Sequence, residues 1–204
     1  RPFTAVPENQ PVGSLLVGRD FAGAEAAAER MRAAQPGSAD AQALAGDVQL
    51  LLGHGEAAVE RYRLASRVRM PESLLQRMVA AMVLAGQQRE AAVLVEAYLV
   101  QTPSSPVAVR LAASVAAGRA DWSRARQLLE FLRANGSAGD VHLLADLSQA
   151  QLRSGDAETA EATAREAYRL APSNPLSAKA WGLCLNALKQ RPADARALLA
   201  RAGA

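Results

Sequence analysis

Apolar residues recur along the chain at spacings of three and four positions, which is the period of a helix with one buried face. Residues 157–172 read AETAEATAREAYRLAP after a Ser-Gly-Asp turn, and residues 21–36 read FAGAEAAAERMRAAQP after Gly-Arg-Asp. A proline ends both segments, and its ring cannot continue a helical hydrogen-bond ladder. The pattern therefore predicts helices that begin and end at regular places.

The same unit returns about every 34 residues. The predicted helix ends are Pro36, Met70, Pro103, Ser137 and Pro172, which are separated by 34, 33, 34 and 35 residues. A small residue twelve positions before each end recurs in step, at Ala24, Ala58, Ala91, Ala125 and Ala160. Because the two series agree, the sequence predicts an internal repeat.

Each unit divides into two amphipathic helices around a tight turn. A residue with positive φ is expected in each turn, because such a residue ends a helix. Glycine adopts positive φ values without a steric clash. The candidates are Gly53, Gly86, Gly118 or Ala120, and Gly155. Small residues such as Gly46, Ala58 and Ala65 lie where the two helices are expected to cross, which favours closely spaced axes.

These features resemble the tetratricopeptide repeat (TPR), a unit of about 34 residues with preferred small, aromatic and proline positions. The unit that starts at Ala39 matches it with Gly46, Ala58, Tyr62 and Ala65. The aromatic residue of the fourth position is missing from every unit. The resemblance implies an all-α fold, a right-handed superhelical solenoid of antiparallel helix pairs in which each unit stacks on the next.

The repeat also predicts the organisation of the chain. Residues 1–11 contain three prolines and are expected to form an extended tail. Residues 12–204 are expected to form the repeat domain. Its predicted parts are a half repeat at 12–38, full repeats at 39–71, 72–105, 106–140 and 141–174, and a degenerate C-terminal pair at 175–204.

Composition supports a helical, globular chain and excludes several kinds of site. The chain has 47 Ala, 27 Leu and no Ile, a usage that favours helix over strand. Its net charge of +3 is too small for a polybasic protein. One cysteine and two histidines cannot form an ordinary zinc site. The longest uncharged apolar stretch, 78–86, is too short to span a bilayer. No catalytic residue, cofactor or metal is predicted.

The resemblance implies that the first helix of each unit lines a concave groove for a partner. Carried over position by position, the predicted groove residues are Asp40, Asp47, Leu50, Leu51, Gln76, Val83, Leu84, Arg110, His142, Gln149, Leu152, Arg153 and Lys179. The carboxylate clamp known in the family is absent, because Ala43 and Asp47 stand where it requires a base and an amide.

Apolar side chains are expected to dominate binding in this groove. Burying a leucine contributes about 1.5–3 kcal/mol, whereas an exposed ion pair contributes about 0–1 kcal/mol. The predicted anchors are Leu50, Leu51, Val83, Leu84 and Leu152. The alternative is that these side chains pack against neighbouring helices of a tight superhelix.

The sequence thus predicts a non-catalytic scaffold that binds a peptide or helix of a partner protein, and it leaves the partner's identity open. Envelope assembly, secretion and polysaccharide export are possible settings, and a second copy of the chain is a possible partner. The absence of a starting Met favours a bacterial periplasmic protein over a cytoplasmic one. One alternative is an RNA-binding helical repeat, since residues 103–204 carry 13 basic and 9 acidic residues. The other is a structural, self-associating array.

Overall fold

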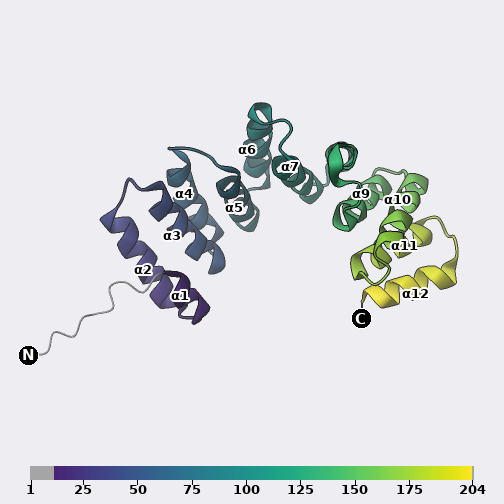
Figure 1. The fold of residues 1–204 in the computed structure, drawn as a ribbon, viewed down its shortest axis with the longest axis horizontal. Coiled ribbons are helices and arrows are strands. Elements are labelled where there is room, and N and C mark those ends of the chain that lie inside the picture. The colour runs from purple at the N-terminus through teal and green to yellow at the C-terminus, as the bar shows by residue number, and fades with distance from the viewer. Residues whose placement is uncertain (1–11, 204) are drawn as a thin grey trace, which may run out of the picture. The chain divides into compact units, whose positions relative to one another are not determined.

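The computed structural model of the protein describes residues 12–203, so the predicted tail, residues 1–11, lies outside the described part. Between residues 12 and 203 the chain forms twelve α-helices, one short π-helical turn and no strand (Figure 1). The first helices are α1 (Val12–Val17), α2 (Phe21–Ala34), α3 (Ala39–Leu51), α4 (Gly55–Ser66), α5 (Glu72–Leu84) and α6 (Gln88–Gln101). The others are α7 (Pro106–Gly118), α8 (Trp122–Leu132), η1 (Arg133–Ser137), α9 (Val141–Arg153), α10 (Ala157–Leu170), α11 (Pro175–Ala187) and α12 (Pro192–Ala202).

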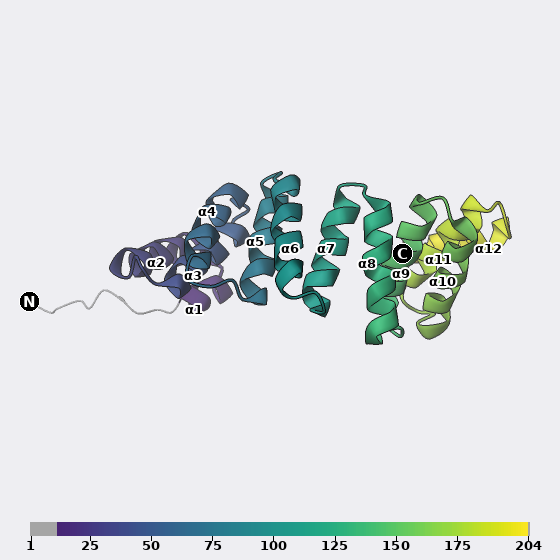
Figure 2. The same cartoon turned by 90° about the horizontal axis from the view of Figure 1, so that it is seen from above.

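The described residues group into two compact units, and the boundary between them along the chain falls within α6. Unit 1 ends at Val95 and unit 2 begins at Glu96. In each unit, consecutive helices pack against one another, as α3 packs on α4 and α9 on α10. Figure 2 shows α7 and α8 side by side in unit 2.

Polar side chains at the helix starts explain where the helices begin. Ser, Asp and Asn side chains accept a hydrogen bond from a backbone N–H group of the first turn, which otherwise has no partner inside the helix. The capping residues of this kind are Asp20, Ser38, Ser105, Asp121, Asp140, Asp156 and Asn174.

The turns between paired helices use positive φ, as the repeat predicts. Gly53, Gly86 and Gly155 have φ values of 81°, 75° and 89°. In the pair α7–α8 the sequence leaves Gly118 and Ala120 as alternatives, and the structure selects Ala120, with φ 59°. Gly118 is instead the last residue of α7. This turn therefore holds a residue with a Cβ in a conformation that favours glycine.

In unit 1 the crossing of α3 and α4 depends on the absence of a side chain at Gly46. A Cβ on this residue would lie 2.6 Å from Cε1 of Tyr62. The Tyr62 ring is fully buried there, and its hydroxyl donates a hydrogen bond to Asp47 at 2.7 Å. Ala58 and Ala65, the other small residues expected at this crossing, are buried as well.

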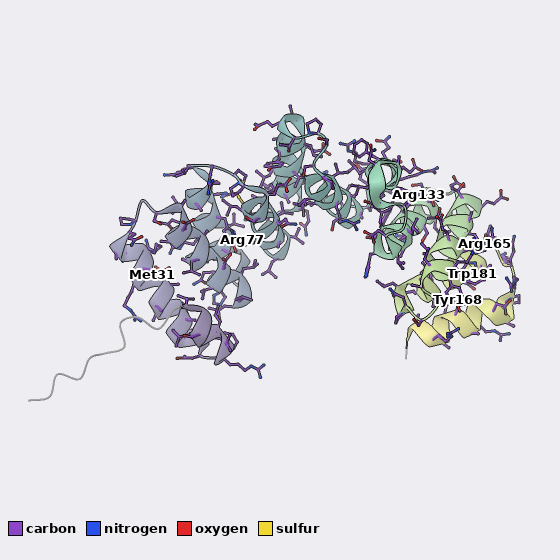
Figure 3. The ribbon with its side chains drawn as sticks, viewed as in Figure 1. Met31, Arg77, Arg133, Arg165, Tyr168 and Trp181 are labelled. Atoms are coloured by element: carbon purple, nitrogen blue, oxygen red, sulfur yellow. The ribbon has the colours of Figure 1, made fainter. Side chains whose placement is uncertain are left out.

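Unit 2 has its core in α9, whose Leu143, Leu144 and Leu147 have no exposed surface. Towards the C-terminus, Ala178 and Leu185 of α11 pack with Ala195 and Leu198 of α12. The rings of Tyr168 and Trp181 lie next to this cluster with their centroids 5.0 Å apart (Figure 3). Trp181 also donates a hydrogen bond to Glu161 at 2.7 Å. The aromatic pair thus joins α10 to α11.

Candidate functional site

Two neighbouring cavities lie along α7, α9 and α11 in unit 2. The larger, of about 460 Å³, is lined by Arg110, Ala113, Ser114, Ala117, Trp122, Ala125, Leu129, Asp146, Gln149 and Ala150. The smaller, of about 110 Å³, is lined by Ala145, Asp146, Ser148, Gln149, Leu152, Leu176, Lys179, Ala180, Leu183 and Cys184. Because Asp146 and Gln149 border both cavities, we describe the two cavities together as the inner cleft.

The inner cleft brings together part of the predicted groove. Arg110, Gln149, Leu152 and Lys179 all line it. Leu152 is only partly available, since it also packs against the buried cluster that contains Cys184. Both alternatives for the leucines therefore apply to this residue: it borders the cleft and supports the neighbouring helices.

Two other predicted residues of unit 2 lie near the inner cleft without lining it. The guanidinium of Arg153 stacks over the Trp122 ring, 5.1 Å from its centroid. His142 is exposed at the start of α9, and its charge acts on Asp146. These residues therefore influence the cleft through the side chains that form it.

Trp122 and Asp146 are cleft residues that the sequence did not predict. Trp122 begins α8, the second helix of its pair, and only first helices were expected to contribute. Asp146 occupies the sixth position of its unit, next to the fifth position that the resemblance singles out. The signal that identifies Asp146 is its spacing of three residues from Gln149, which puts both side chains on one helix face.

Of the charged residues that line the larger cavity, Arg110 has an ion-pair partner among the described residues and Asp146 does not. The guanidinium of Arg110 donates to Asp140 at 2.5 Å, and Asp140 also caps α9 by accepting from the Leu143 N–H. Burial by itself raises the pKa of Asp140, but the hydrogen bond from Leu143 and the Arg110 charge lower the pKa more, so the net shift is downward. Arg110 thus already has an ion-pair partner within the protein.

Asp146 has no such partner. No hydrogen bond or ion pair to its carboxylate occurs within residues 12–203. Asp146 is exposed, yet partial desolvation by the surrounding protein raises its pKa, and the charges of Arg110 and His142 offset only part of this effect. The inner cleft therefore contains one uncompensated acidic group.

The two aspartates are expected to respond to substitution in opposite directions. The raised pKa of Asp146 means that its ionisation destabilises the fold as the pH rises from about 4, the ordinary value, through the raised one. Asp146→Asn should therefore raise the melting temperature at pH 7.

The lowered pKa of Asp140 means that the stability contributed by its ionised carboxylate is lost as the pH falls through that lowered value. Asp140→Ala should cost about 1–2 kcal/mol of stability at pH 7, because both the helix cap and the ion pair are lost. Thermal denaturation of both variants and carboxyl ¹³C NMR titrations measure these effects; a lower titration midpoint for Asp146 than for Asp140 would contradict them.

Unit 1 presents the remaining predicted groove residues on α3 and α5. Asp47 is already engaged, because it accepts from the Tyr62 hydroxyl and pairs with Arg77 at 2.7 Å. Leu51, Val83 and Leu84 are 63%, 45% and 52% exposed. Leu50 is half-buried, whereas Asp40 and Gln76 are exposed. Unit 1 thus offers exposed apolar side chains at the C-terminal ends of α3 and α5.

Unit 2 also has a cavity of about 420 Å³ formed largely by the second helices of the pairs. Leu99 and Val100 border it from α6, Leu128 and Phe131 from α8. Arg124 and Glu96 also line it, and Arg124 donates two hydrogen bonds of 3.0 and 2.9 Å to Glu96. Its charged groups are therefore paired, unlike Asp146 in the inner cleft.

Residues 12–203 contain no group of three or more His, Cys, Asp or Glu side chains arranged to hold a metal ion. Among the helices that the structure describes, none has the length and apolar character that crossing a bilayer requires.

The helix pairs define the class of fold, which is that of the TPR proteins. The chain superposes on the C-terminal part of a TPR repeat-containing protein from Cytophaga hutchinsonii with a TM-score of 0.73 and 12% identity, over 94% of this chain and 76% of that one. It is similarly close to MamA from Desulfovibrio magneticus RS-1, with a TM-score of 0.71 and 17% identity over 81% and 93% of the two chains.

A third similar structure is YrrB, described as a TPR protein with an unusual peptide-binding site, with a TM-score of 0.66 and 16% identity over 85% of this chain and 89% of that one. No family model matches the sequence, and no curated protein matches it. The predicted all-α, TPR-like fold is therefore confirmed by structural likeness.

Proposed function

We propose that this protein is a non-catalytic scaffold that binds a peptide or short helix of a partner protein, and that the inner cleft is a binding site. The observation that carries the proposal is a cavity of about 460 Å³ on α7, α8 and α9, lined by small side chains, one leucine, one tryptophan and a few polar groups. Such a lining suits an extended chain or a helix face, whose apolar side chains enter the cleft while polar groups set its orientation.

The fold supports this proposal in a second way. Similar structures include a TPR protein with a peptide-binding site, and stacked helix pairs present long surfaces for partners. On unit 1, the exposed Leu51, Val83 and Leu84 offer a separate apolar surface. The setting of the partner, in envelope assembly, secretion or polysaccharide export, stays a prediction from the sequence.

Selection from a library of random 12-residue peptides on the immobilised protein tests the proposal. We expect enrichment of peptides whose binding is lowered by about tenfold or more in the variant Ser114→Trp, because the indole fills space that the ligand needs. Ser114 is exposed and lines the larger cavity, so the substitution leaves the buried core intact. Titration calorimetry with one selected peptide measures the loss.

The matched control is Ser123→Trp, the same change at an exposed position of α8 that does not line the inner cleft. This variant should bind the selected peptides as the unmodified protein does. If no peptide is enriched, or if Ser114→Trp binds as tightly as Ser123→Trp, the inner cleft is not a peptide site.

A further inference from the structure

Asp146 is exposed and is the acidic residue of the inner cleft that has no hydrogen-bond or ion-pair partner within residues 12–203. Arg110 is bonded to Asp140, and Arg153 lies over Trp122. Lys179 lines the smaller cavity but not the larger one; it too has no ion-pair partner among the described residues, and no ion pair joins it to Asp146. Asp146 therefore borders both cavities without a direct partner for its carboxylate within residues 12–203.

This arrangement is unfavourable for the protein alone. The shift in the pKa of Asp146 shows that the folded chain disfavours the charged form, because the protein removes water from the carboxylate and replaces only part of its solvation. Asp140, the N-cap residue of α9, adds like charge, while Arg110 and His142 attract. A ligand that supplied a cation to Asp146 would remove this deficit.

The other side chains of the larger cavity indicate which ligand group would lie next to that cation. Trp122, Leu129 and Ala125 line the larger cavity from α8, so the part of the lining that α8 contributes is apolar. Gln149 adds an amide one turn further along α9, where it can bond a peptide backbone group. The larger cavity is thus suited to an apolar side chain close to a basic one.

We infer that the peptide bound in the inner cleft presents an arginine or lysine side chain to Asp146, next to an apolar side chain that packs against Trp122. This inference rests on the proposed function and names the chemistry of its ligand. A guanidinium binds a carboxylate through two parallel hydrogen bonds, so arginine fits best. An acidic side chain is disfavoured in the larger cavity, because Arg110 is already paired there and Asp146 repels it.

Parallel peptide selections on the unmodified protein and on Asp146→Asn test the inference. Peptides enriched on the unmodified protein should carry Arg or Lys at a fixed spacing from an apolar residue, and those enriched on the variant should lack this preference. The variant keeps the size of the side chain and removes its charge. Since ionised Asp146 destabilises the fold, Asp146→Asn is expected to remain folded, which circular dichroism verifies.

A double-mutant cycle then isolates the contact. In one selected peptide, replacing the basic residue by its neutral counterpart, citrulline for arginine, should weaken binding to the unmodified protein about tenfold, the value of one charge-assisted contact. The same replacement should have little effect on binding to Asp146→Asn. Glu158→Gln is the matched control: it removes one acidic charge from an exposed position on α10, and it should retain the full preference.

The outcomes separate the inference from the proposed function. If peptides are selected and blocked by Ser114→Trp but show no basic residue, or if Asp146→Asn keeps the preference, the inference is wrong while the cleft remains a peptide site. If Glu158→Gln loses the preference as well, general charge attraction accounts for it, and the contact with Asp146 is refuted. If no peptide is selected, both proposals fail.

Discussion

Replacing Gly46 with valine is expected to destabilise unit 1 by about 3 kcal/mol, the upper end of the usual cost of overpacking a core. Even the first added carbon would lie 2.6 Å from the Tyr62 ring. The ring cannot easily move away, because it is fully buried and its hydroxyl is bonded to Asp47. Urea denaturation followed by circular dichroism measures the loss as a lower transition midpoint.

The control is Gly13→Val, because a Cβ at Gly13, also in a helix of unit 1, meets no atom within 4 Å. This variant should change the midpoint little. A second check is the pair Gly46→Val with Tyr62→Ala, in which the removed ring makes room for the valine. The double variant should lose less stability than the sum of the single ones. Equal losses at Gly46 and Gly13 would show that the close approach of α3 and α4 has no energetic importance.

Leu147→Ala is expected to destabilise unit 2 by about 2–5 kcal/mol, because it removes a buried isobutyl group and leaves a cavity. Leu147 has no exposed surface, and α9 packs against α8, α10 and α11. Both tryptophans of the chain, Trp122 and Trp181, lie in unit 2. Tryptophan fluorescence during urea denaturation therefore reports the unfolding of this unit.

Leu170→Ala provides the comparison for this core substitution, since Leu170 is exposed at the end of α10. Its expected effect is within about 0.5 kcal/mol, as is usual for surface positions. A loss at Leu147 no larger than that at Leu170 would mean that α9 does not form the core of unit 2.

Much of the fold could be predicted from the sequence because helix ends and helix crossings depend on local residue types. Proline, glycine and the small residues at crossings specify where a helix stops and how closely its partner approaches. The confirmed examples are the positive φ at Gly53 and the burial of Ala58 and Ala65 beside Tyr62. The turn at Ala120 needed the structure, since a nearby glycine offered an equally good local solution.

The candidate site was less predictable, because it depends on which side chains form hydrogen bonds and ion pairs with one another across helices. Asp47 and Arg110 were expected in a groove, yet each is held by a partner about thirty residues away in the chain, Arg77 and Asp140. Asp146 was not expected, although it is the acidic residue of the inner cleft that has no hydrogen-bond or ion-pair partner within residues 12–203. Pairing of this kind follows from the stacking of successive repeats, which periodicity alone does not describe.

The burial of Cys184 makes this protein convenient for site-specific labelling. Its side chain is 1% exposed, and burial raises the pKa of the thiol to about 11, so almost none of it is thiolate at neutral pH. It is also the chain's single cysteine. A cysteine introduced at an exposed position on α9 would therefore react selectively with a maleimide dye, and the native thiol need not be removed first.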